Sequence, residues 1–168
     1  KGDEDNLLMS MDDLKDTPGA GVIIVQVLLD KTIDSKDAEC KAIISVISIL
    51  YKQRKISRPD IQTPMTDMVE YLDAFLIDSP NALRYVTNML AEFIGLQALE
   101  ISWLCEIAKL HQERNPQLIP KIIEHTVDTF KLSQGAEKAK ATFDLSKACL
   151  STLLGADAWD TIYKTKLM

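Results

Sequence analysis

Residues 78–95 read DSPNALRYVTNMLAEFIG and carry the clearest structural pattern in the chain. Ser79 has a side chain that can cap a helix. Pro80 fits the first helical position, because the N–H that proline lacks would have no partner within the helix there. Apolar residues then recur with the spacing of one helix face. They are Ala82, Leu83, Val86, Met89, Leu90, Phe93 and Ile94. Gly95 is expected to follow the helix in a left-handed conformation. The stretch therefore predicts an amphipathic helix that begins at Pro80 and ends before Gly95.

The same pattern extends outward in both directions and predicts helices along most of the chain. The further helices are expected over residues 3–16, 21–33, 34–51, 60–76, 98–111, 116–130, 136–154 and 156–167. Asp34 and Ser35 are expected to cap the third of these helices. Residues 21–33 are ambiguous, because their β-branched run favours a strand by propensity. We expect a helix there because the neighbouring segments are helical.

Linkers of two to six residues between helices force antiparallel neighbours. The expected fold class is therefore all-α, a HEAT-like stack of antiparallel helical hairpins with about eight helices. No low-complexity stretch or internal linker interrupts the chain, so residues 1–168 are interpreted as a single domain. Because the chain begins with Lys1, we interpret it as a piece of a larger protein.

Charge and hydropathy exclude several classes of function. The formal net charge is −6, and such a domain repels phosphate backbones, so no direct nucleic-acid partner is expected. The longest apolar run, residues 22–29, is broken by Gln26 and too short to cross a bilayer, so no membrane partner is expected. Cys40, Cys105 and Cys149 are interpreted as buried thiols in the reducing cytoplasm, in preference to a disulfide or a metal site. An acidic surface suits a basic protein partner, although solubility alone explains it equally well.

No motif for an enzyme, cofactor or metal is present. The chain lacks GxxxxGK[ST], GxGxxG, HExxH, GxSxG and CxxC, and no cofactor is expected. His111 and His125 fall in different predicted helices without ligand spacing, and His111 is interpreted as a cationic helix end. Trp103 and Trp159 are interpreted as core residues because apolar residues lie one helical turn away.

The turn around residue 78 is the candidate site for a protein partner. Asp73 and Asp78 bracket a turn between two helices, and Ser79 and Pro80 stiffen it. Carboxylates on a rigid, exposed turn can meet Arg or Lys of a partner. The alternative is that Asp78 only stabilises the start of the following helix through the helix dipole.

The same turn resembles the MI (MA-3) domain of translation initiation factor 4G scaffolds, a family that includes death-associated protein 5 and programmed cell death protein 4. The family signature is a small apolar–Asp–x–Pro–x–Ala turn, followed by Leu-Ala-x-Phe on the next helix. Residues 77–82 read IDSPNA and residues 90–93 read LAEF. Residues 34–56 and 2–14 are similar to the segments before this turn, and residues 143–168 are a weaker match to the last helices. The first family helix is missing.

The resemblance implies a non-enzymatic scaffold domain that docks the DEAD-box helicase initiation factor 4A. Asp78 matches the family's contact residue on the turn. The second family acid, four residues earlier, falls on Ala74, and Asp73 lies one position away. The resemblance therefore implies the scaffold role more strongly than the helicase contact. The partner-binding residues predicted from the pattern and the resemblance together are Asp73, Asp78, Ser79 and Asn81.

Two other functions remain open from the sequence. One is an architectural helical repeat, a spacer or self-association unit that binds no helicase. The other is a helical enzyme, which requires His111 and His125 to converge with carboxylates in a pocket.

Overall fold

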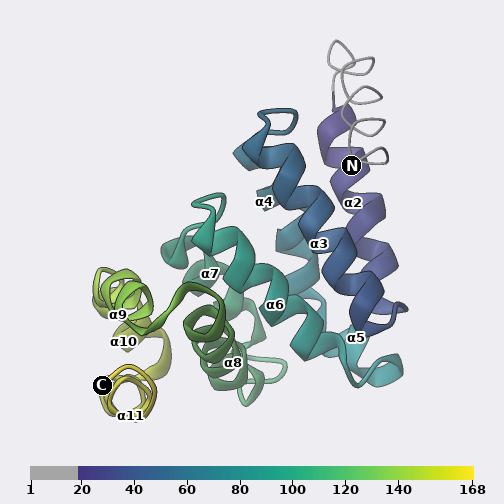
Figure 1. Cartoon of the computed structure of the whole chain (residues 1–168). Helices are drawn as coiled ribbons and strands as arrows, with labels where there is room; N and C mark the ends of the chain where they lie inside the picture. The colour runs from purple at the N-terminus through teal and green to yellow at the C-terminus, as the bar shows by residue number, and fades with distance from the viewer. Residues whose placement is uncertain (1–18) are drawn as a thin grey trace. The chain divides into compact units, whose positions relative to one another are not determined.

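The computed structural model describes residues 19–168, which are all-α and contain no strand (Figure 1). The expected fold class is confirmed, and residues 20–33, the ambiguous segment, form a helix. The helix expected over residues 3–16 lies outside the described residues. The chain divides into two compact units, residues 1–68 and 69–168. The prediction of one domain over residues 1–168 stays a prediction.

The first unit contains a helical hairpin, α2 (Ala20–Ile33) and α3 (Asp37–Lys52), which pack side by side. Helix α4 (Arg58–Glu70) follows and crosses the boundary between the units. Buried apolar side chains recur on each helix at the expected spacing, for example Val25 and Leu29 on α2 and Ile44 and Ile47 on α3. Burial of these stripes explains why β-branched residues are helical here, since tertiary packing overrides their strand propensity.

The two ends of α3 differ from the prediction. Lys36 is the N-cap residue, without a side-chain cap, whereas Asp34 closes the end of α2. At the other end Arg54 takes a left-handed conformation with φ 59°. The Lys55 N–H donates to Leu50 O at 2.8 Å and the Arg54 N–H donates to Tyr51 O at 3.0 Å. This is a Schellman motif, which satisfies the last carbonyls of the helix.

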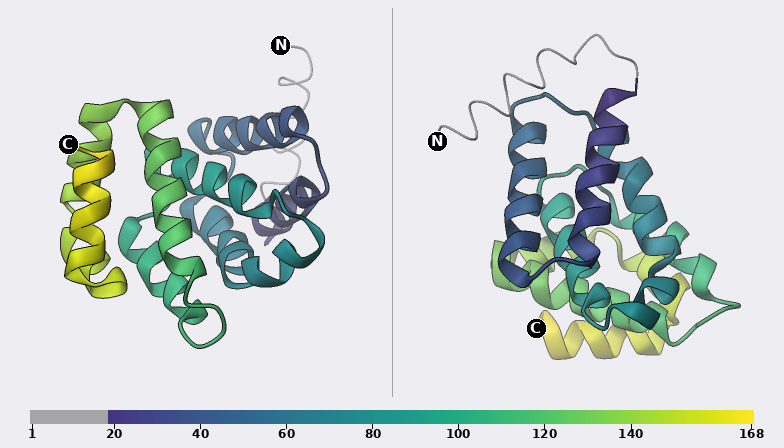
Figure 2. Two further views of the ribbon diagram at one scale, coloured as in Figure 1. Left: turned by 90° about the horizontal axis from the view of Figure 1, so that it is seen from below. Right: turned by 90° about the vertical axis from the view of Figure 1, so that its right-hand side faces the viewer.

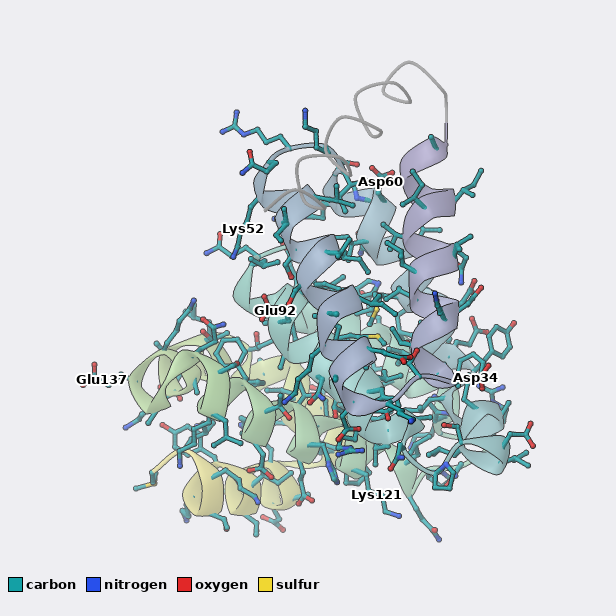
Figure 3. The ribbon with its side chains drawn as sticks, turned by 45° about the vertical axis from the view of Figure 1, so that its right-hand side comes forward. Asp34, Lys52, Asp60, Glu92, Lys121 and Glu137 are labelled. Atoms are coloured by element: carbon teal, nitrogen blue, oxygen red, sulfur yellow. The ribbon has the colours of Figure 1, made fainter. Side chains whose placement is uncertain are left out.

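Asp60 fixes the start of α4 (Figure 3). Its Oδ2 accepts hydrogen bonds from the Ser57 N–H at 2.8 Å and from the Ser57 hydroxyl at 3.0 Å. The Asp60 carboxylate also lies against α2, where a Cβ on Gly21 would be 2.5 Å from Oδ2. Helix α4 therefore begins two residues before the predicted start at residue 60, with a capped first turn.

The second unit holds the remaining helices (Figure 2). They are α5 (Leu72–Asp78), α6 (Ala82–Gly95), α7 (Ile101–Ala108), the 3-10 helix η1 (Lys109–His111), α8 (Leu118–Gln134), α9 (Ala136–Asp144), α10 (Lys147–Leu154) and α11 (Ala156–Lys166). Helix α8 packs along α6 and also contacts α9 and α11, while α10 contacts α7 and α11. Helix α6 buries most of the apolar face that its sequence pattern predicts.

Aromatic side chains join the last helices of the chain. Phe130 and Phe143 meet edge to face at 5.5 Å between ring centroids, and Trp159 lies 6.3 Å from Phe143. Trp159 is 1% exposed and Trp103 is 8% exposed, so both tryptophans lie in the core as expected. Lys166 of α11 pairs with Asp128 of α8 at 3.1 Å, which adds a polar contact at the rim of the cluster.

The described residues contain ten α-helices, more than the expected eight, because two predicted helices are each divided. The segment expected over residues 60–76 is interrupted at Tyr71, which has φ −99° and ψ 15°. The segment over residues 136–154 is interrupted at Ser146, which becomes the N-cap residue of α10. The Ser146 side chain makes no capping bond, and its carbonyl accepts from the Leu150 N–H at 3.1 Å at the start of α10.

The end of α6 corrects the role assigned to Gly95. Gly95 is the last helical residue, and Gln97 takes the left-handed conformation with φ 63°. The Ala98 N–H donates to Phe93 O at 2.9 Å, which makes a second Schellman motif. A Cβ on Gly95 would lie 2.8 Å from the Gln134 Nε2 of α8, the end of a flexible side chain that can move aside.

None of the helices in residues 19–168 combines the length and the apolar composition that a bilayer crossing requires.

Candidate functional site

The candidate site begins at a short connection between α5 and α6. The Ser79 N–H donates to Phe75 O at 2.9 Å and closes α5. The Ala82 N–H donates to Ser79 O at 3.0 Å, so residues 79–82 form a tight turn before α6. Two backbone hydrogen bonds and the fixed φ of Pro80 hold this corner. The expected turn between the two helices is present in the second unit.

Its caps differ from the predicted ones. Ser79 is the C-cap residue of α5, whereas the prediction made it the N-cap residue of the next helix. Asn81 precedes α6 and makes no side-chain capping bond, although its carbonyl accepts from the Tyr85 N–H at 3.0 Å. The Ser79 carbonyl accepts the hydrogen bond of the tight turn, and regular α-helical hydrogen bonding begins only after it, at Ala82. Ser79 is partly buried, and Asn81 is exposed.

Asp78 is the last residue of α5 and is exposed. Within residues 19–168 its carboxylate has no hydrogen-bond or ion-pair partner, and it therefore does not cap α6. Its negative charge lies at the C-terminal end of α5, where the helix dipole is unfavourable to an anion. The local contacts of Asp78 therefore give no sign that its carboxylate stabilises the fold.

Ala74 lies one helical turn before Asp78 and is also exposed. Residues four apart share a helix face, so Ala74 occupies the place where the resemblance expects a second acid. Ile77 is 82% exposed beside Asp78. The end of α5 therefore offers one carboxylate with apolar neighbours, and not a pair of acids.

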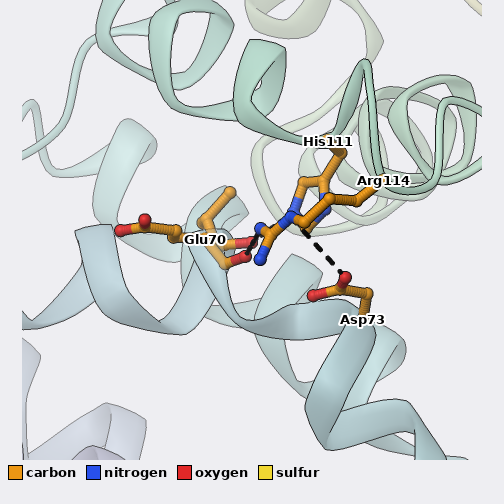
Figure 4. Close-up of polar contacts among 5 residues, drawn as sticks. Glu70, Asp73, His111 and Arg114 are labelled. Atoms are coloured by element: carbon orange, nitrogen blue, oxygen red, sulfur yellow. Dashed lines mark hydrogen bonds and ion pairs between the residues drawn. The ribbon is translucent and has the colours of Figure 1, made fainter.

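Asp73 has a different environment, shown in Figure 4. Its Oδ2 lies 3.8 Å from the Arg114 Nε, and its Oδ1 is buried and accepts no hydrogen bond within the described part of the chain. The Asp73 side chain is 23% exposed. It also lies in the first turn of α5, where the helix dipole favours a carboxylate. Asp73 is thus engaged within the second unit.

Arg114 and His111 attach the loop after η1 to the residues that precede α5 (Figure 4). The Arg114 guanidinium donates to Glu70 O, and the His111 Nε2 lies 2.6 Å from Val69 O. Because a carbonyl oxygen only accepts, Nε2 carries the proton of this bond. His111 is the last residue of η1, as its interpretation as a helix end predicts, but its ring is fully buried and faces a backbone carbonyl of another helix.

Sequence reasoning missed both of these residues. Their partners are backbone carbonyls more than 40 positions away in sequence, and such contacts leave no periodic pattern. The one available signal is the residue type, since a histidine among apolar neighbours often satisfies a buried backbone group. The predicted set is thus only partly brought together: Asp78, Ser79 and Asn81 share the turn, whereas Asp73 faces Arg114.

The site has the chemistry of a docking surface. Its exposed groups are a carboxylate, an amide and an isoleucine side chain, which can contact a cation and a small apolar surface. Within residues 19–168, no three His, Cys, Asp or Glu side chains gather in a group that could hold a metal ion.

A comparison with protein families finds one match. The family described as the MA3 domain matches residues 1–100, which is 100 of the 168 residues. MA3 domains are all-α, HEAT-like modules that mediate protein–protein interactions. The matched range includes α5, the turn and α6. No curated protein and no solved structure matches the chain.

Proposed function

The chain belongs to the MA3 domain family, as its central motif predicts, and on that premise we propose that it docks the DEAD-box helicase initiation factor 4A as part of a translation initiation scaffold. In this role it has no enzymatic activity, and it works in the cytoplasm, where translation initiation takes place. The partner-binding residues are Asp78, Ser79 and Asn81, with Asp73 as a supporting residue.

The observation that carries the proposal is the exposed carboxylate of Asp78. A carboxylate without a partner in the described chain is fully available to an Arg or Lys side chain. Its position at the end of α5 is held by the backbone bonds of residues 75–82, so little conformational entropy is lost on binding. The net charge of −6 adds a long-range attraction for a basic surface.

Asp73 supports the site without belonging to its contact surface. Its carboxylate is directed toward Arg114, and this pair joins the start of α5 to the loop after η1. We therefore assign Asp73 to the positioning of α5, and Asp78 to the contact with the helicase. This division refines the predicted set, in which both carboxylates face the partner.

A titration of purified helicase 4A with the chain tests the proposal. Charge reversal in Asp78→Lys is expected to weaken binding at least about tenfold, because it replaces an attraction with a repulsion at the centre of the contact. The matched control is Glu137→Lys on α9, which makes the same charge change at an exposed position (Figure 3). The control is expected to bind within about twofold of the unchanged chain, since a distant surface charge acts only through the screened field.

Two outcomes would contradict the proposal. Equal binding by Asp78→Lys and the unchanged chain would remove Asp78 from the site. No binding by the unchanged chain would remove the helicase as partner and favour an architectural repeat domain. Sedimentation of the chain alone would then measure self-association.

A further inference from the structure

Two cysteines that lie far apart in sequence meet in the second unit. Cys105 is on α7 and Cys149 is on α10, and their Sγ atoms are 3.5 Å apart. Helices α7 and α10 pack against each other, so packing on both sides holds the two thiols at this distance. A disulfide requires about 2.05 Å between the sulfur atoms, so the two thiols must move closer together to form one.

The two thiols differ in their access to solvent. Cys105 is 2% exposed, whereas Cys149 is partly exposed. Both line a surface pocket of about 280 Å³, and the rest of its wall is Ser102, Glu106, Lys109, Ala148 and Thr152. Both thiols border the pocket, but a small polar oxidant has better access to the partly exposed Cys149 than to the buried Cys105.

The hydrogen bonds of the two thiols also indicate that Cys149 reacts before Cys105. Cys105 donates toward the Cys149 sulfur, and Cys149 donates to Ser146 O at 3.2 Å. Burial, together with the neighbouring Cys149, raises the pKa of the Cys105 thiol far above its ordinary value. Cys105 therefore stays protonated and does not react first with an oxidant from solution.

We propose that Cys105 and Cys149 form a redox-sensitive pair, in which a peroxide oxidises Cys149 and Cys105 then closes an intramolecular disulfide. This inference does not depend on the proposed helicase contact. It uses the 3.5 Å approach of the two sulfur atoms and the pocket beside Cys149.

The chemistry balances with hydrogen peroxide as the oxidant. The Cys149 sulfur, after losing its proton, attacks one peroxide oxygen; an S–O bond forms, the O–O bond breaks, and hydroxide leaves with that proton as water. The Cys105 thiol then gives its proton to the sulfenic oxygen of Cys149 as its sulfur attacks the Cys149 sulfur; an S–S bond forms, the S–O bond breaks, and a second water leaves. Two thiols lose two electrons, and one peroxide is reduced to two waters.

Mass spectrometry of the folded chain tests the pairing. The chain is treated with a small excess of hydrogen peroxide, the remaining thiols are alkylated, and the protein is digested with trypsin without reduction. Cleavage after Arg and Lys places Cys105 on residues 85–109, Cys149 on residues 148–164, and Cys40 on residues 37–41. The expected product is a disulfide between the first two peptides, with Cys40 alkylated.

A thermal scan measures the consequence for folding. The disulfide joins residues 44 positions apart and restricts the unfolded chain. The oxidised chain is expected to unfold more than about 5 °C above the reduced chain, and dithiothreitol is expected to reverse the shift. An unchanged or lower midpoint after the disulfide has formed would contradict the fit of a bridge between α7 and α10.

Two variants identify the order of reaction. In Cys105→Ala, Cys149 is expected to stop at the sulfenic acid and to be labelled by dimedone. In Cys149→Ala, a change at a partly exposed position, Cys105 is expected to stay unreactive toward peroxide while the protein is folded. Cys40→Ala is the matched control and should form the same disulfide as the unchanged chain.

Other products would overturn the inference. Sulfinic acid on Cys149 without a cross-link would mean that Cys105 cannot reach it. A disulfide that includes Cys40, or a folded chain that does not react at all, would show that the two sulfur atoms are not paired in solution. The same pairing preference in the urea-unfolded chain would show that the fold does not select it.

Discussion

The two ends of α5 carry the same residue type in opposite environments. At the start, Asp73 is partly buried, directed toward Arg114, and lies where the helix dipole favours a carboxylate. At the end, Asp78 is exposed, without a partner in the described chain, and lies where the dipole opposes it. These opposite environments support the proposed division of roles, in which Asp73 positions α5 and Asp78 contacts the partner.

The largest expected effect on stability concerns the contact of His111 with Val69 O, which lies just before the start of α5. His111→Ala removes a buried imidazole and leaves Val69 O without its donor. We expect the free energy of unfolding to fall by about 2–4 kcal/mol, because a cavity and an unsatisfied carbonyl act together. Urea denaturation measures this loss.

His125→Ala is the matched control, since His125 is exposed on α8. It is expected to change the free energy of unfolding by less than about 0.5 kcal/mol. Equal losses for the two histidine variants would contradict the role assigned to His111.

The role of the C-terminal end of α5 can be tested by adding the second acid that the resemblance expects there. Ala74→Asp places a carboxylate one turn before Asp78 on the same exposed face. We expect helicase affinity to rise about fivefold, which corresponds to about 1 kcal/mol. Ala74→Asn keeps the size of the side chain without the charge and is expected to bind like the unchanged chain. A gain in both variants would mean that charge is not the cause.

The proposed division of roles predicts a small effect at Asp73. Asp73→Asn keeps the shape and removes the charge, and the pair with Arg114 is long and partly exposed. We expect a loss of less than about 1 kcal/mol in stability and less than about a twofold change in helicase affinity. Asp78→Asn should show the reverse pattern: unchanged stability and weaker binding. If Asp73→Asn weakens helicase binding more than Asp78→Asn does, Asp73 and not Asp78 is the residue that contacts the helicase.

Salt dependence gives the smallest expected effect. Binding of the helicase by the unchanged chain should weaken as ionic strength rises, because exposed charges are screened within about 10 Å at 0.1 M salt. Asp78→Asn should show a shallower dependence, since one attractive charge is gone. Isothermal titration at two salt concentrations measures the difference, and parallel slopes would place the electrostatic contact elsewhere.

The sequence predicts the helices well where a helix buries a continuous apolar stripe. Helix α6 is the clearest case, because its apolar residues repeat at the helical period and are buried in the fold. The prediction was less accurate at helix ends. Gly95 is predicted to take the left-handed position, but Gln97 takes it, because the preference for glycine there is statistical and other residues can adopt the conformation.

Local pattern was therefore enough for the all-α class, the family and the exposed turn at Asp78, because each rests on residues close together in the sequence. Contacts between distant residues needed the folded chain: Asp73 with Arg114, His111 with Val69, and Cys105 with Cys149. Each of these joins side chains or carbonyls about 40 positions apart. No period in the sequence encodes such a meeting, since it depends on how several helices pack together.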